Sequence, residues 1–160
     1  MLLNKFLRKF TIIILFFCLL GCQQNNQSVQ NDNQNILQDK TIHQKGDSMN
    51  LIIDNQKYEV ELYQNETVQA LISQLPINVT MNELNGNEKY IYLDQSLPSH
   101  SQSVNFIHAG DIMLFGNDCL VLFYEDFQTT YQYTMIGKLK SVDNLKENLG
   151  KDSIQITFQN

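Results

Sequence analysis

The most reactive side chains in this sequence belong to one cysteine and two histidines. Cys119 is the only cysteine beyond residue 22, and His100 and His108 precede it in the chain. These side chains could form a metal site or a Cys–His nucleophile pair, but structural zinc ligands come in closely spaced pairs, and the sequence has none. Four apolar residues follow Cys119, which is typical of a small core residue. We therefore expect Cys119 in the core, and we predict no catalytic residue, metal site or cofactor.

The carboxylates offer little acid–base chemistry. Glu125 and Asp126 are adjacent at the end of an expected strand. Neighbouring side chains on a strand point to opposite faces, so these two carboxylates cannot act jointly on one substrate. The sequence also lacks the motifs of phosphate loops, dinucleotide sites, serine hydrolases and EF-hands, which leaves those functions without support.

Aromatic side chains offer a second kind of chemistry, which is the non-covalent holding of a ligand. They gather in the later strands and in the segment after Glu125. Most of these aromatic residues would fill a core. Tyr131 and Tyr133, however, are flanked by Gln and Thr, which predicts an exposed loop where the two rings could hold an extended peptide or a small ligand. The residues that we predict to bind a ligand are Tyr92, His108, Tyr124, Tyr131 and Tyr133.

Short strands must position these side chains. From residue 49 onward, apolar residues alternate or form short runs that Asn, Asp and Gly interrupt. The two runs at 111–115 and 119–124 are almost continuously apolar, which indicates strands covered on both faces. Strands are predicted at 51–53, 58–63, 77–81, 90–93, 111–115, 119–124, 135–139 and 154–158. Turns are expected at Asp54-Asn55-Gln56 and at Asn85-Gly86-Asn87, each joining two of these strands into a hairpin.

Two short helices interrupt the strands. Asn65 is the expected N-cap of the first, whose apolar residues recur at helical spacing up to Leu75, and Pro76 stops it. The second is expected at 144–148. Eight short antiparallel strands hide their edges most economically by closing on themselves. We therefore predict a mainly β fold, a closed eight-stranded antiparallel barrel with two short helices, in one domain over 49–160.

The balance of charge excludes most nucleic-acid binders. The chain has 11 basic and 17 acidic residues, a net charge of −6. Three of the basic residues, Lys5, Arg8 and Lys9, lie in the first 21 residues, so that 8 − 17 = −9 remains without this segment. Such a surface repels phosphate backbones, and we predict no nucleic-acid partner.

The first 21 residues have the pattern of a signal peptide, a cationic start followed by an apolar run from Phe10 to Leu20. This run is too short for a bilayer-spanning helix, which needs about 20 apolar residues. The run ends in Leu19-Leu20-Gly21-Cys22, which resembles the lipobox of bacterial lipoproteins. The resemblance implies cleavage before Cys22, acylation of its thiol, and anchoring on the outer face of the bacterial cytoplasmic membrane. Ordinary secretion with an incidental Cys22 is the alternative.

Residues 22–48 are predicted to be a flexible spacer. Ten of the thirteen residues from Gln23 to Asn35 are Asn or Gln, and no apolar periodicity follows. Such a segment cannot bury a core. A solvated spacer that lifts the domain off the membrane is the expectation, with prion-like assembly as the alternative.

Several short motifs carry a family resemblance that spans 51–158. They are Leu75-Pro76-Ile77, the run NGNEKYIYL at 85–93, AGDI at 109–112, and LFYEDF at 122–127 with IGK at 136–138. In this order and spacing they resemble the bacterial cyclophilin-like proteins, a family of small eight-stranded barrels. The resemblance implies the cyclophilin barrel.

The resemblance does not imply cyclophilin activity. Prolyl isomerisation has a barrier of about 18–20 kcal/mol, and true cyclophilins are understood to lower it with an arginine that donates to the prolyl nitrogen. The only arginine is Arg8, in the predicted signal peptide, and a lysine lacks the planar fork of donors. We therefore predict a non-catalytic module that binds a peptide or a small molecule. A peptidyl-prolyl isomerase or other enzyme of this barrel is the alternative, and a purely structural or partner-docking lipoprotein is a third.

Overall fold

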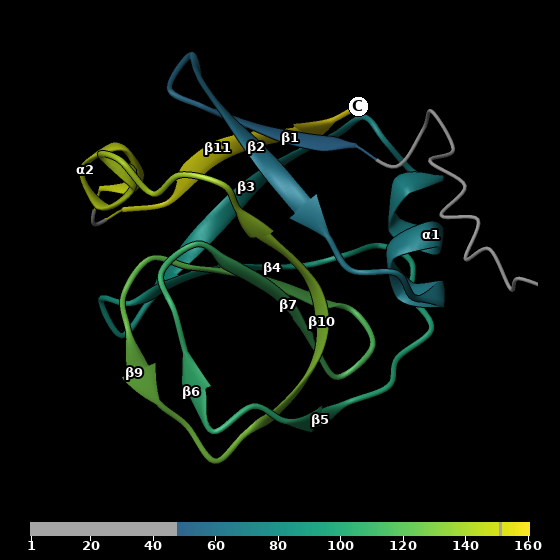
Figure 1. Cartoon of the computed structure of the whole chain (residues 1–160). Helices are drawn as coiled ribbons and strands as arrows, with labels where there is room; N and C mark the ends of the chain where they lie inside the picture. The colour runs from purple at the N-terminus through teal and green to yellow at the C-terminus, as the bar shows by residue number, and fades with distance from the viewer. Residues whose placement is uncertain (1–47, 151) are drawn as a thin grey trace, which may run out of the picture. The chain divides into compact units, whose positions relative to one another are not determined.

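The computed structural model describes residues 48–150 and 152–160 (Figure 1). The predicted signal peptide, the acylated Cys22 and nearly all of the spacer lie outside the described residues. Within the described ranges no helix has the length and apolar character that crossing a bilayer requires.

A closed antiparallel barrel forms the domain. Its wall runs in the order β2-β1-β11-β3-β4-β8-β7-β10, and β10 pairs again with β2, so the sheet has no free edge. The predicted eight-stranded barrel is therefore confirmed. The wall strands are β1 (Met49–Ile53), β2 (Gln56–Leu62), β3 (Ile77–Leu84), β4 (Glu88–Tyr92), β7 (Asp111–Phe115), β8 (Cys119–Phe123), β10 (Gln132–Leu139) and β11 (Ile154–Gln159).

Tight turns fix the register of the first hairpins. Between β1 and β2, Asp54 and Asn55 have φ values of 46° and 65°. Between β3 and β4, Asn85 and Gly86 have φ values of 56° and 74°. Asp, Asn and Gly adopt this left-handed conformation at the lowest cost, and it matches the twist of the flanking strands. The two turns predicted from sequence are therefore present.

Two helices pack against the barrel on opposite sides of it in Figure 1. In α1 (Glu66–Ile72), Asn65 is the N-cap, and its side-chain oxygen accepts from the Val68 N–H at 2.9 Å. The helix ends at Ile72, earlier than the apolar spacing up to Leu75 predicts, because the chain tightens into a turn there. In α2 (Leu145–Leu149), both terminal leucines are buried in the barrel interior.

The core divides into two clusters, one on each face of the wall. Alternate residues of the strands, such as Leu120 and Leu122 of β8, fill the barrel interior. The intervening residues, such as Val121 and Phe123, belong to a second cluster on the outer face. The near-continuous apolar runs are thus covered on both faces, as predicted.

Three short strands that the sequence pattern does not predict provide this outer cover. β6 (Phe106–Ile107) pairs with β9 (Phe127–Gln128), and β5 (Gln102–Ser103) pairs with β10. The buried Ile107 and the partly buried Phe127 pack into the outer cluster. Strands of two residues are too short to show an alternation in sequence.

The seam between β2 and β10 closes the barrel. Only three residue pairs join these strands, and Gly137 lies opposite Leu62 in one of them. A Cβ atom on Gly137 would lie 2.7 Å from Val60 Cγ1 and 2.8 Å from the Glu61 carbonyl oxygen. Both distances are shorter than van der Waals contact, so only glycine lets the two strands approach closely enough to pair.

Gly137→Ala is expected to lower the free energy of unfolding by about 2–3 kcal/mol, because the added methyl group overpacks the seam against backbone. Urea unfolding followed by far-UV circular dichroism measures this change. Gly116→Ala is the control, because a Cβ there meets nothing within 4 Å and only the positive φ of +64° is strained. It is expected to cost about 1 kcal/mol, and an equal loss in both variants would contradict the role of the seam.

Candidate ligand-binding site

A cavity of about 850 Å³ lies on the outer face of the barrel wall. Its floor consists of outward residues of β4 and β8, and it is also lined by β9 and by the loop of residues 129–131 that joins β9 to β10. The loop is held by two hydrogen bonds, from the Thr129 N–H to the Asn105 carbonyl oxygen and from the Tyr131 N–H to the Thr129 hydroxyl oxygen. A volume of about 300–1,000 Å³ is typical of pockets for small molecules.

Strand alternation places one charged and two aromatic side chains on the cavity floor. Glu88, Tyr90 and Tyr92 of β4 alternate with Lys89 and Ile91, and the first three line the cavity. The register sets Tyr90 opposite Val121 and Tyr92 opposite Cys119 on β8. The floor is therefore continuous across two hydrogen-bonded strands, which gives it a rigid backbone.

Aromatic rings surround the opening. Phe115 lies 5.9 Å from Tyr131 and 5.7 Å from Tyr133 between ring centroids, and Tyr90 lies 5.9 Å from Tyr92. Tyr92 and Tyr131 are each more than 60% exposed, at 62% and 63%. Exposed aromatic rings beside a cavity are a common feature of ligand-binding surfaces.

Glu88 is the charged side chain of the cavity. Burial, and to a smaller extent the nearby Glu83 carboxylate, raise the pKa of its carboxyl from 4.5 to about 6. Among the described residues, no hydrogen bond or ion pair reaches the Glu88 carboxylate. An ionised group without a partner in a half-buried site costs free energy. The cavity thus contains, at neutral pH, a negative charge that no side chain of the described residues compensates.

Cys119 also faces the cavity, but its thiol is unreactive. Burial raises the pKa of Cys119 to about 11, with smaller contributions from Asp118 and Glu88. The thiol is therefore protonated at neutral pH, and the thiolate is the nucleophilic form. The structure buries this residue, as predicted for a core cysteine.

The structure brings three of the five predicted ligand-binding residues together. Tyr92, Tyr131 and Tyr133 all line the cavity, although no finding tests whether they bind a ligand. The prediction that Tyr133 is exposed on a loop is wrong, because it lies in β10 and is only 5% exposed. Its ring packs against Phe115 and Phe123, and burial raises its pKa to about 12.

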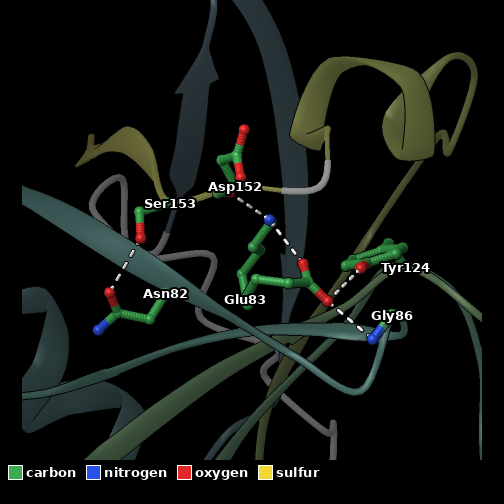
Figure 2. A network of polar contacts seen from close by, with 7 residues as sticks. Asn82, Glu83, Gly86, Tyr124, Asp152 and Ser153 are labelled. Atoms are coloured by element: carbon green, nitrogen blue, oxygen red, sulfur yellow. Dashed lines mark hydrogen bonds and ion pairs between the residues drawn. The ribbon is translucent and has the colours of Figure 1, made fainter.

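Tyr124 points into the barrel and does not line the cavity. Its hydroxyl donates to Glu83 Oε1 at 2.7 Å, and the Gly86 N–H donates to the same oxygen at 2.8 Å (Figure 2). The other carboxylate oxygen lies 2.6 Å from Lys89 Nζ, which also donates to the Asp152 carbonyl oxygen at 2.6 Å. The side chain of Lys89 is fully buried. Tyr124 therefore belongs to a polar network inside the wall.

Hydrogen bonds decide the charge state of this network. Burial alone would raise the pKa of Glu83, but the hydrogen bonds from Lys89, Tyr124 and Gly86 outweigh it, and the pKa falls below its ordinary value. Glu83 is therefore an ionised carboxylate paired with the buried Lys89 ammonium. Its charge is compensated, in contrast to that of Glu88.

His108 lies in a second, smaller hollow of about 390 Å³, which Asp111 and Lys138 also line. Its Nδ1 is 3.8 Å from Asp126 Oδ2, while the adjacent Glu125 pairs with Lys146. The two neighbouring carboxylates thus have separate partners. No group of three or more His, Cys, Asp and Glu side chains in the described ranges is placed to hold a metal ion.

The model of the Cyclophilin-like family matches residues 51–159. The chain belongs to this family. Among solved structures, the cyclophilin-like chain is similar to the solution structure of a hypothetical protein from Archaeoglobus fulgidus, at 19% identity and a TM-score of 0.47. That similarity covers 74% of this chain and 98% of the other. No curated protein matches the sequence.

Glu88 and Tyr90 are among the residues of the cyclophilin-like site that escape the sequence prediction. Glu88 and Tyr90 share the outer face of β4 with Tyr92. The period-two spacing of residues 88, 90 and 92 is a signal that could have found them. In β4, however, apolar or aromatic residues occur at both odd and even positions. The sequence alone therefore does not show which set faces the interior and which faces outward.

Glu88→Gln is expected to raise the free energy of unfolding by about 1 kcal/mol at a pH of about 7.5 and to leave it unchanged at a pH of about 4. The native carboxyl has a raised pKa of about 6, so between pH 4.5 and pH 6 it binds more protons than the carboxyl of the unfolded chain. The stability of the native chain therefore falls as the pH rises through this window. The amide lacks this cost. The full shift corresponds to about 2 kcal/mol, which solvent screening of the half-exposed group reduces.

Urea unfolding at several pH values, followed by circular dichroism, measures the difference between the variant and the native chain. Glu61→Gln removes an exposed carboxylate of β2 and serves as the control for net charge. A difference between Glu88→Gln and the native chain that is constant with pH would contradict the assignment of the shifted pKa.

Proposed function

We propose that the mature protein is a lipoprotein on the outer face of the bacterial cytoplasmic membrane, whose cyclophilin-like barrel holds a peptide or small molecule without transforming it. Acyl chains on Cys22 anchor the protein, and residues 22–48 form a spacer between the membrane and the barrel. The cavity on the outer wall is the binding site. The observation that carries the proposal is this cavity, with exposed aromatic rings at its mouth.

The sequence supports the tether. The cationic, apolar start and Leu19-Leu20-Gly21-Cys22 together match the features that a lipoprotein signal requires. Several acyl chains on one cysteine bind essentially permanently, whereas one chain binds only marginally. The spacer composition supports separation of the barrel from the bilayer.

The chemistry of the cavity supports binding over catalysis. No arginine follows residue 8, so the donor that cyclophilin isomerases use is missing from the mature chain. The Cys119 thiol is protonated at neutral pH. By contrast, the aromatic rings provide apolar contact area at low cost in side-chain entropy, which favours ligand binding.

Cys22→Ala is expected to abolish membrane anchoring, because the thiol that accepts the diacylglyceryl group is lost. The full chain is expressed in a bacterium with a lipoprotein pathway, and membrane and soluble fractions are compared after labelling with a radioactive fatty acid. The native chain is expected to carry label in the membrane fraction, and the variant none. Cys119→Ala is the control, since its buried thiol is not an acceptor. Equal labelling of native chain and Cys22→Ala would sink the lipoprotein proposal.

Exchange NMR of proline-containing peptides tests binding against isomerisation. The full chain in detergent micelles is added in catalytic amounts, and the cis–trans cross-peaks and line widths of the peptides are followed. Broadened peptide lines without growing cross-peaks are the expected result. Cross-peaks that grow with protein would establish an arginine-free isomerase, and a library of peptides and small metabolites that yields no ligand would refute the binding proposal.

A further inference from the structure

The cavity has an uncompensated negative charge and no positive one. Glu88 is the only ionisable acid or base among its lining residues apart from tyrosines and the protonated Cys119, and within the described residues no lysine, arginine or histidine lines it. Its neighbour Glu83 is neutralised by the buried Lys89, which points to the other side of the wall. The field in the cavity is therefore negative.

The aromatic side chains of the cavity also attract positively charged groups. The face of a tyrosine ring carries a negative partial charge, so a cation above it is stabilised, more strongly where water is partly excluded. Tyr92 and Tyr131 expose their rings at the mouth, and Tyr90 lies beside Glu88 on the floor. A positive group in the cavity is thus attracted both by aromatic rings and by a carboxylate.

The energetic state of Glu88 favours such a guest. Its carboxylate is half-buried without a partner, and its pKa is raised to about 6. A bound cation would restore the missing partner and remove the cost of ionising this carboxyl. A bound anion would add a second negative charge to the same site.

We propose that the cavity binds an organic cation, a small molecule with an ammonium group on an apolar body. The ammonium group pairs with the Glu88 carboxylate, and the apolar body lies among Tyr92, Phe115 and Tyr131. The volume of about 850 Å³ accommodates a ligand of this size. This inference rests on the proposed binding function and specifies the ligand class.

A matched series of three probes tests the sign of the charge. Phenylbutylamine, phenylbutanol and phenylbutanoate share one apolar body and carry a cation, a neutral group and an anion at the far end of the chain. Isothermal titration calorimetry measures their affinities for the full chain in nonionic micelles. The amine is expected to bind about tenfold more tightly than the alcohol, the scale of a hydrogen bond to a charged group, and the carboxylate more weakly than both.

Two variants separate the contributions of the carboxylate and the rings. Glu88→Gln is expected to reduce amine affinity about tenfold and to leave alcohol affinity unchanged. Tyr131→Leu keeps an apolar side chain at an exposed position and is expected to reduce amine affinity about threefold more than alcohol affinity. Glu61→Gln changes the net charge by the same amount as Glu88→Gln, but at a position away from the cavity. It is expected to alter neither the amine affinity nor the alcohol affinity.

The pH dependence provides an independent readout. The ionisable groups that interact electrostatically with Glu88 are Glu83 of β3, Cys119 of β8, Tyr124 just after β8, and Tyr133 of β10. Glu83 stays ionised because its pKa is lowered, and the raised pKa values of the other three keep them neutral. Amine affinity is therefore expected to fall about tenfold between a pH of about 7.5 and one of about 5, through protonation of Glu88 alone. Glu88→Gln is expected to abolish this dependence.

The outcomes distinguish this inference from the proposed function. Equal binding of amine and alcohol, or tighter binding of the carboxylate, would overturn the cation inference while the cavity remains a binding site. If none of the three binds, the cation inference also fails, and the library of peptides and metabolites then decides the proposed function by itself. An amine preference that survives in Glu88→Gln would refute the role of this carboxylate.

Discussion

Closure of the barrel at the β2–β10 seam is the constraint on which the rest of the structure depends. The seam has few residue pairs, and it forms because Gly137 leaves room for Val60 and for the backbone of β2. Once the sheet is closed, each strand has one face toward the interior and one toward the outside. The helices and the outer strands then only need to cover the surfaces that closure defines. The geometry of the candidate site therefore follows from a contact on a different part of the wall.

Double coverage of the wall creates the cavity. β7 and β8 are apolar on both faces, so their outer residues need a second cover, which the β6–β9 pair provides. This cover is much smaller than the wall beneath it. Beyond its edge, Tyr90, Tyr92 and Phe115 remain on the outer face beside a loop held by Thr129. The hollow is thus the part of an apolar surface that the chain itself leaves partly uncovered.

The sequence was sufficient to predict the barrel but not the contents of the site. Alternation, the Asn65 cap and the turns at Asp54 and Asn85 are local signals, and each produced the expected element. The prediction for Tyr133 is wrong because its polar neighbours suggest a loop, whereas pairing with Gln102 of the distant β5 makes it part of β10. Tyr124 and Glu88 could not be assigned to a face from sequence, because the side on which a strand meets the interior depends on the closed sheet. The lipid anchor stays a prediction.

The adjacent residues Glu88 and Lys89 give β4 an electrical polarity across the wall. The lysine is fixed inside by Glu83 and by the Asp152 carbonyl oxygen, and the glutamate therefore faces the cavity. A shift of β4 by one residue would exchange the two, placing an ammonium group in the cavity and a carboxylate beside Glu83 in the interior. That arrangement would bury two like charges together, which is strongly unfavourable. The buried lysine thus fixes the register of β4. A change of one residue in the length of the turn before β4 would therefore reverse the sign of the charge that the cavity presents to a ligand.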